Sequence, residues 1–175
     1  MVTKKIYFIR HAESEFNVAQ RRKGYYPYPN APLSEEGIRQ ARKLGEKLSP
    51  IRFDTIFCSP LLRANQTLNF ADLSKKQSVP IIVDANIREH KNVRSDLLES
   101  EPPNQFESMA EVKKRALAFI ETLKAYDATT IAVVSHGTFL STLLKELTGQ
   151  TTFLDNTEYK IVEIEEGESD LEEVE

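Results

Sequence analysis

The sequence contains one cysteine, three histidines and no long hydrophobic run. The single thiol of Cys58 excludes an internal disulfide framework and favours a reducing compartment, and we interpret it as a small buried side chain. No apolar segment approaches the roughly 20 residues that a helix needs to cross a bilayer. The apolar stretch Ile6–Ile9 stops at Arg10 and is too short for a secretory signal. We therefore expect a cytoplasmic protein without membrane contact.

The charge is small overall but unevenly distributed. The net charge of the 175 residues is −4, although Glu163 to Glu175 alone carry eight acidic residues and no basic one. Residues 1–162 therefore carry about +4, which suits a phosphorylated small molecule and is too weak and too mixed in sign for nucleic acid. The length fits one domain. We expect residues 1–166 to form it and residues 167–175 to be a solvated acidic tail.

Strand-like and helix-like patterns alternate along the chain. The predicted strands are Lys5–Ile9, Asp54–Cys58, Val79–Val83, Thr129–Val134 and Glu158–Ile164. The predicted helices are Glu35–Leu48 with Ser34 as N-cap, Pro60–Asp72 with proline in its first turn, Ser108–Tyr126, and a segment that follows Gly137 and ends near Gly149. Strands separated by helices form right-handed crossovers, so the pattern predicts a three-layer α/β/α sandwich with a mostly parallel central sheet.

Two of the three histidines follow predicted strands directly. His11 comes after Lys5–Ile9 and Arg10. His136 comes after Ser135 and the strand at residues 129–134, which is continuously apolar over residues 131–134. One histidine after a strand is usually structural or exposed, but two in equivalent positions indicate a site, because ligands bind at the carboxyl ends of parallel strands. The sequence Ser-His-Gly at residues 135–137 would also offer backbone N–H groups to an anion.

Several short motifs are spread along the chain around these histidines. They are Arg10–Ser14 and Asn17, Gly24, Asn30–Ser34, Gly37, Gln40-Ala41, Cys58–Ala64 and Thr67, Arg88-Glu89, and Val134–Gly137. Together these motifs resemble the signature of the histidine phosphatase (phosphoglycerate mutase-like) superfamily. The resemblance covers most of residues 4–165 in the family's order and spacing, with Ala12 where the family usually has glycine.

The resemblance implies a phosphatase that forms a phosphohistidine. His11 would be the nucleophile, and Arg10, Arg63 and His136 would hold the phosphate, with further substrate contacts from Asn17 and Gly24. Arginine suits this role because its planar guanidinium matches two phosphate oxygens at once. We expect no cofactor and no metal, since these cationic groups could themselves neutralise the phosphate charge.

The leaving group needs a proton and the incoming water must lose one, and a carboxyl group can do both in turn. Glu89 lies where the family carries its acid/base, and Glu13, close to His11 in sequence, is the alternative. Arg88 and His90 flank Glu89 and could tune its pKa or contact substrate, although exposed loop positions would explain them equally well.

Specificity is less clearly encoded. Arg21, Arg22 and Lys23 could bind a second phosphate or a carboxylate, but a solvated basic loop is the simpler interpretation. Tyr25, Tyr26 and Tyr28 could form an aromatic rim or pack their own loop.

Residues 90–107 make a shorter segment after Glu89 than in the family's mutases, which favours a phosphatase. We expect a small phosphorylated metabolite as substrate, with a phosphoprotein or phosphohistidine as the alternative and a non-catalytic phosphate-binding module as the third possibility. The sequence makes no prediction of oligomeric state.

Overall fold

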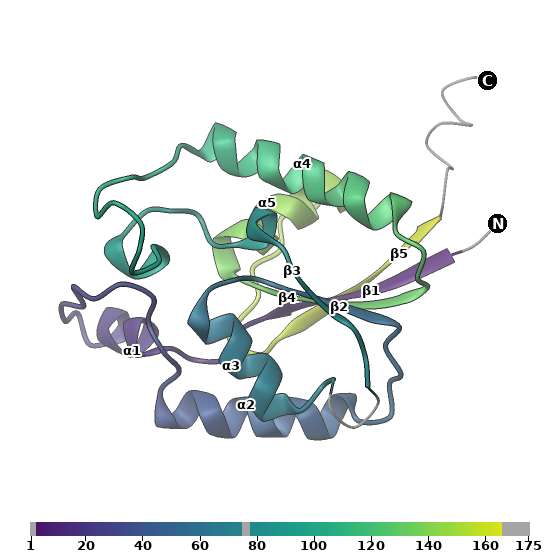
Figure 1. Ribbon diagram of the computed structural model, residues 1–175, viewed down its shortest axis with the longest axis horizontal. Coiled ribbons are helices and arrows are strands. Elements are labelled where there is room, and N and C mark those ends of the chain that lie inside the picture. The colour runs from purple at the N-terminus through teal and green to yellow at the C-terminus, as the bar shows by residue number, and fades with distance from the viewer. Residues whose placement is uncertain (1–2, 75–77, 166–175) are drawn as a thin grey trace.

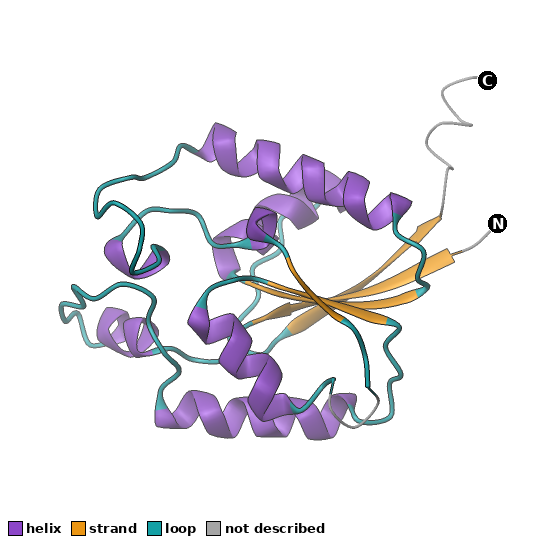
Figure 2. Cartoon of the chain, in the orientation of Figure 1, coloured by secondary structure: helices purple, strands orange, loops and turns teal. Residues whose placement is uncertain are grey.

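The computed structural model describes residues 3–74 and 78–165, which form a central sheet covered by helices on both faces (Figures 1 and 2). The predicted acidic tail, residues 167–175, lies outside the described residues. The strands are β1 (Thr3–Arg10), β2 (Thr55–Cys58), β3 (Ile81–Val83), β4 (Thr130–Ser135) and β5 (Tyr159–Glu165). The helices are α1 (Glu15–Arg21), α2 (Glu35–Leu48), α3 (Leu62–Ala71), α4 (Met109–Ala125) and α5 (Gly137–Thr148).

The five strands are arranged in the order β3-β2-β4-β1-β5. The first four are parallel to one another, and β5 returns antiparallel along β1. The apolar strand β4 therefore lies in the middle of the sheet, as its continuous hydrophobicity predicts. The sandwich with a mostly parallel sheet is confirmed.

Alternate residues of β1 face opposite layers, as the two-residue period of a strand requires. Ile6 and Phe8 join the core under α4 and α5, whereas Tyr7 and Ile9 join the core over α2 and α3. Figure 1 shows these two pairs of helices on either side of the sheet. The central strands are thus covered by apolar side chains on both faces of the sheet. Water therefore reaches these strands only at their ends.

Two local predictions differ from the structure. Helix α3 begins at Leu62, with Pro60 outside it, because Ser59 Oγ accepts the N–H of Leu61 at 3.2 Å and holds an extended turn there. Helix α1 was not predicted. It buries no residue, so it has no apolar stripe, and its capping box joins Ser14 to Asn17 rather than to a glutamate.

The described residues contain no helix that is long and apolar enough to cross a membrane. Cys58 is fully buried, and burial raises the pKa of its thiol to about 12, which keeps it protonated. The interpretation of Cys58 as a small core side chain is confirmed.

The contact between α2 and α3 yields a stability prediction. Gly45 of α2 lies against the backbone of Ala71 in α3, and a β-carbon at position 45 would overlap the Ala71 carbonyl group. Gly45→Ala should therefore lower the free energy of unfolding by about 1–3 kcal/mol, despite the higher helix propensity of alanine. Urea denaturation would measure the change. Gly24→Ala is the control, since its β-carbon would approach Ala19 O only to 3.6 Å; equal losses in both variants would contradict the prediction.

Candidate active site

Three neighbouring strand ends form a pocket with a volume of about 340 Å³. In the register of β1 and β4, Arg10 lies opposite Ser135, so His11 and His136 follow side by side. Their ring centroids are 5.0 Å apart. The next strand, β2, leads into α3, whose first turn supplies Arg63. The residues that line the pocket are Arg10, His11, Phe16, Asn17, Gln20, Arg63, Glu89, His90, Asn92, Val93, Asp96, Gly137, Thr138, Phe153, Leu154 and Asp155.

His11 is buried and held in one tautomer. Its Nδ1 lies 2.6 Å from the carbonyl oxygen of Ala12, which can only accept, so Nδ1 carries the proton. The lone pair of the neutral ring is then on Nε2. Burial lowers the pKa of His11 well below its usual value, and the charges of Arg63 and Arg10 lower it further. A neutral imidazole with a free Nε2 beside two cations is suited to attack an anionic substrate.

His136 lies against His11 and the end of β2. Its Nε2 is 2.7 Å from Ser59 Oγ, and its buried Nδ1 has no hydrogen-bond partner among the described residues. Burial, followed by the charge of Arg63, lowers the pKa of His136 well below its usual value. His136 does not itself line the pocket but packs behind it against His11, as a neutral ring that still has a polar atom to satisfy.

Arg10 is fixed between the start of α5 and the segment before β5. Its Nη1 donates to the carbonyl oxygen of Leu154 at 2.9 Å. A β-carbon at Gly137 would lie only 3.2 Å from Arg10 Nε, so glycine allows the guanidinium to lie against this backbone. Burial lowers the pKa of Arg10, and the charges of Glu89 and Asp155 oppose that effect.

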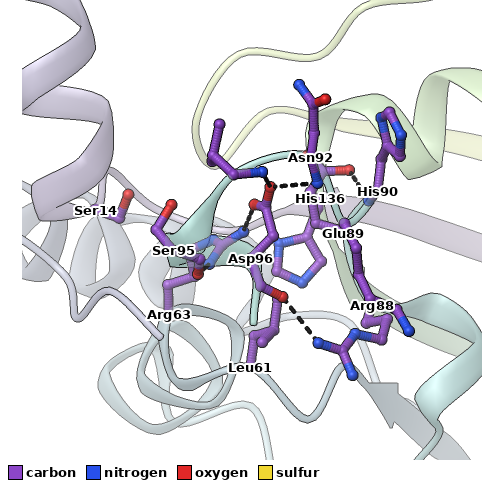
Figure 3. A network of polar contacts seen from close by, with 12 residues as sticks. Ser14, Leu61, Arg63, Arg88, Glu89, His90, Asn92, Ser95, Asp96 and His136 are labelled. Carbon is purple, nitrogen blue, oxygen red and sulfur yellow. Dashed lines mark hydrogen bonds and ion pairs between the residues drawn. The ribbon is translucent and has the colours of Figure 1, made fainter. Parts of the chain in front are cut away.

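Arg63 is buried with its counter-charge, Asp96 (Figure 3). Its Nη2 donates to Asp96 Oδ1 at 3.1 Å and its Nη1 donates to the carbonyl oxygen of Ser95 at 3.0 Å. The other carboxylate oxygen of Asp96 accepts the N–H groups of Asn92 and Val93. One aspartate thus orients the guanidinium and also holds residues 92–96 at the pocket wall.

Glu89 lies at the amino end of α5. Its carboxylate accepts the backbone N–H of Phe139 at 2.9 Å, of Thr138 at 3.2 Å and of His90 at 2.9 Å. Removal of the carboxyl group from water nevertheless raises its pKa, because that effect exceeds the opposing influence of Arg63. A carboxyl group with a raised pKa in a pocket has the property required of a general acid.

Glu13 is directed away from the pocket. Its carboxylate accepts a hydrogen bond from Ser34 Oγ at 2.7 Å and forms an ion pair with Arg21 at 2.5 Å. Neither Glu13 nor Arg21 lines the pocket. Of the two candidate acids, only Glu89 lines the pocket together with His11.

Several predicted contacts are not found at the pocket. Arg22, Lys23 and Gly24 are exposed residues that do not line it, because α1 ends before them and the Gly24 N–H turns back to the carbonyl oxygen of Ala19. The geometry therefore does not support substrate contact from Gly24 or from the basic run.

The tyrosines pack with their own loop. Tyr26 contacts Phe16 and Tyr28, with ring centroids 6.3 Å and 5.5 Å away. Tyr25 is exposed, and none of the three lines the pocket.

Arg88 and His90, the two residues next to Glu89 in the sequence, point to different surroundings. His90 lines the pocket, and its Nε2 donates to the carbonyl oxygen of Glu107 at 2.8 Å. Arg88 points the other way and forms a two-pronged ion pair with Glu101, at 2.9 Å and 2.6 Å. Figure 3 shows Arg88 directed away from His90. Arg88 therefore stabilises the loop that carries Asp96 and does not line the pocket.

Sequence reasoning missed Asp96 and Asn156. Asn156 Nδ2 donates to the carbonyl oxygen of His11 at 3.1 Å and lies 3.3 Å from Asn17 Oδ1, which places Asn17 at the pocket. No motif marks either residue. The position of Asn156 becomes clear only in the structure. The chain reverses just before β5, and this reversal brings the Thr157 N–H to the carbonyl oxygen of Arg10.

The α/β/α sandwich, with its histidines and arginines gathered at one edge of the sheet, is of the phosphoglycerate mutase-like class. The sequence matches the family model of the histidine phosphatase superfamily (branch 1) over residues 6–96 and 90–175. The chain therefore belongs to this superfamily.

Similar proteins include named phosphatases. The adenosylcobalamin/alpha-ribazole phosphatase of Salmonella typhi is 30% identical over 162 residues, covering 82% of this chain and 79% of that protein. Phosphoserine phosphatase 1 of Hydrogenobacter thermophilus is 29% identical over 189 residues, covering 93% and 87%. The crystal structure of the alpha-ribazole phosphatase from Shigella flexneri shares the fold, with a TM-score of 0.76, 23% identity and coverage of 92% and 91%.

The buried Arg63–Asp96 pair predicts a large effect of charge removal. Asp96→Asn leaves the Arg63 charge uncompensated and should lower the free energy of unfolding by about 3–5 kcal/mol in phosphate-free buffer. The side chains of this pair are 4% and 6% exposed. Glu36→Gln is the matched control, because the Arg39–Glu36 pair is 65% and 53% exposed and should contribute less than about 1 kcal/mol. Similar losses in the two variants, measured by urea denaturation, would contradict the assignment.

Proposed function

We propose that the protein is a metal-independent phosphomonoesterase that acts on small phosphorylated metabolites through a phosphohistidine at His11. The observation that carries the proposal is the tautomer of His11. A neutral ring with its lone pair on Nε2 lies among Arg10, Arg63 and Glu89, and each of these has a separate task in phosphoryl transfer.

In the first step, Arg10 and Arg63 bind the phosphate oxygens and His11 Nε2 attacks phosphorus in line with the ester oxygen. The P–O bond breaks, and Glu89 donates its proton to the departing alkoxide, which leaves as the alcohol. Asn17 contributes an amide donor, and His136 contributes its unsatisfied ring nitrogen as a further polar contact to the phosphoryl group.

In the second step, the ionised Glu89 accepts a proton from water as the water oxygen attacks the phosphoryl group on His11. The P–N bond breaks, orthophosphate forms and the neutral imidazole is restored. Glu89 ends the cycle protonated, so the same carboxyl group serves as acid and then as base. The raised pKa of Glu89 supports the first role, and its place at the pocket supports the second.

Substitution of the nucleophile tests the chemistry directly. His11→Ala should abolish hydrolysis of p-nitrophenyl phosphate, because no other group forms the covalent intermediate. Wild-type protein quenched during turnover should carry an acid-labile phosphoryl group on His11, detectable by mass spectrometry. Activity should persist in EDTA. Activity that survives in His11→Ala, or that is lost to chelation and restored by a metal ion, would contradict the mechanism.

Substitution of the acid tests how the proton is delivered. Glu89→Gln should slow hydrolysis of an alkyl phosphate by about 10²–10⁴-fold. It should slow p-nitrophenyl phosphate much less in the first step, because nitrophenolate leaves without a proton. A burst of nitrophenol in stopped-flow traces would separate the two steps. Equal slowing of the first step for both esters would exclude Glu89 as the acid.

The pH profile should reflect both residues. His11 must be neutral, and because its pKa is lowered, kcat/KM should persist well below pH 6.5 before it declines. Glu89 must be protonated, and because its pKa is raised, alkyl phosphate hydrolysis should continue above the usual pKa of a glutamic acid and then decline as pH rises through the raised value. In Glu89→Gln the decline at higher pH should disappear. An unchanged profile would assign that decline to another group.

A further inference from the structure

The positive charges of the pocket are confined to its phosphate end. Among the described residues, Arg10 and Arg63 are the only lysine or arginine side chains that line it. Both already make hydrogen bonds to backbone carbonyl groups, and Arg63 also pairs with Asp96. Once a phosphate occupies these two groups, no further lysine or arginine of the described pocket wall is available to a second anionic group on the substrate.

The negative charges are distributed differently. Glu89 and Asp96 are engaged by backbone N–H groups and, for Asp96, by Arg63. Asp155 also lines the pocket, but it is exposed, and its carboxylate has no hydrogen bond or ion pair within the described ranges 3–74 and 78–165. Its charge acts on Arg10, which is the only cationic side chain for which an interaction with Asp155 is found among the described residues. Once a phosphate occupies Arg10, the Asp155 carboxylate therefore presents a negative charge to the rest of the substrate.

Apolar surface lies beside this charge. Phe16, Val93 and Phe153 line the same pocket. The side chain of Phe153 is 76% exposed, although an aromatic ring of this size normally gains by burial. A substrate that covers Phe153 would remove apolar surface from water within the same pocket.

We infer that the site selects phosphomonoesters whose alcohol part has an apolar or aromatic surface and no negative charge, and that Asp155 rejects anionic alcohols while Phe153 binds apolar ones. The inference rests on the proposed function. It excludes phosphorylated acids with a second phosphate or a lone carboxylate as preferred substrates, and it favours neutral or cationic alcohols.

Three matched esters test the charge preference: benzyl phosphate, 4-carboxybenzyl phosphate and 4-(aminomethyl)benzyl phosphate. Their leaving groups are chemically alike and differ mainly in distant charge. At low ionic strength, kcat/KM for the neutral ester should exceed that for the carboxylate by roughly tenfold, with the amine equal to or above the neutral ester. In Asp155→Asn the ratio of neutral to anionic ester should fall by about threefold to tenfold, and added salt should reduce the difference.

The informative quantity is the ratio of kcat/KM between the neutral and the anionic ester. The charge of Asp155 also interacts with that of Arg10, so Asp155→Asn can change phosphate binding, but such a change affects all three esters alike. Asp127→Asn is the matched control, since Asp127 is exposed and does not line the pocket.

The apolar contact is tested separately. Phe153→Ala should raise KM for benzyl phosphate by about fivefold or more and leave KM for ethyl phosphate nearly unchanged. Phe106→Ala, at an exposed residue outside the pocket, should change neither.

The outcomes distinguish the inferred substrate preference from the proposed phosphatase mechanism on which it rests. Hydrolysis of the esters in the predicted order, with the ratio reduced in Asp155→Asn alone, supports the inference. Hydrolysis without a charge preference, or with the carboxylate preferred, overturns the inference and leaves the phosphatase mechanism standing. No hydrolysis of any ester, with no phosphoryl group trapped on His11, overturns both.

Discussion

The parallel pairing of β1 with β4 is the constraint on which the rest of the site depends. The N–H of His11 donates to the carbonyl oxygen of Ser135 at 2.9 Å, as the last step of this ladder. Because the two strands end in register, the two imidazoles follow them side by side. A shift of one residue would turn one ring to the opposite face of the sheet. The apolar layers above and below, which fix the register, are therefore also responsible for the chemistry.

Much of the fold and the centre of the site could be predicted from the sequence because both depend on local signals. Periodicity identifies β4 as a buried central strand, and the position of a histidine after a strand is enough to place it at the carboxyl edge of the sheet. Ser34 and Ser108 mark the starts of α2 and α4 through side-chain caps, and the structure has both caps. These features need only a few neighbouring residues and the rules of strand and helix geometry.

The remainder depends on contacts between distant segments, which no local pattern encodes. Asp96 matters because Arg63, 33 positions earlier, would otherwise be an unpaired buried charge. Asn156 matters because β5 returns along β1. Conversely, Arg21 stands in a basic run that suggests substrate binding, yet the structure pairs it with Glu13. Arg21 lies at the end of α1, and this position brings it to Glu13. Hydrophobic periodicity does not identify α1, because the helix is short and buries no residue.

The carboxylate of Glu89 occupies the free N–H groups at the start of α5, where an anion from solution would otherwise bind. When Glu89 is ionised, the protein thus supplies its own anion to the positive end of that helix dipole. In the proposed mechanism, orthophosphate formed in this pocket would find those N–H groups already occupied, and the arginines, Asn17 and His136 would hold it. In the proposed mechanism, the group that delivers protons is thus separate from the groups that retain phosphate, so retention of the product could be weakened without loss of the acid.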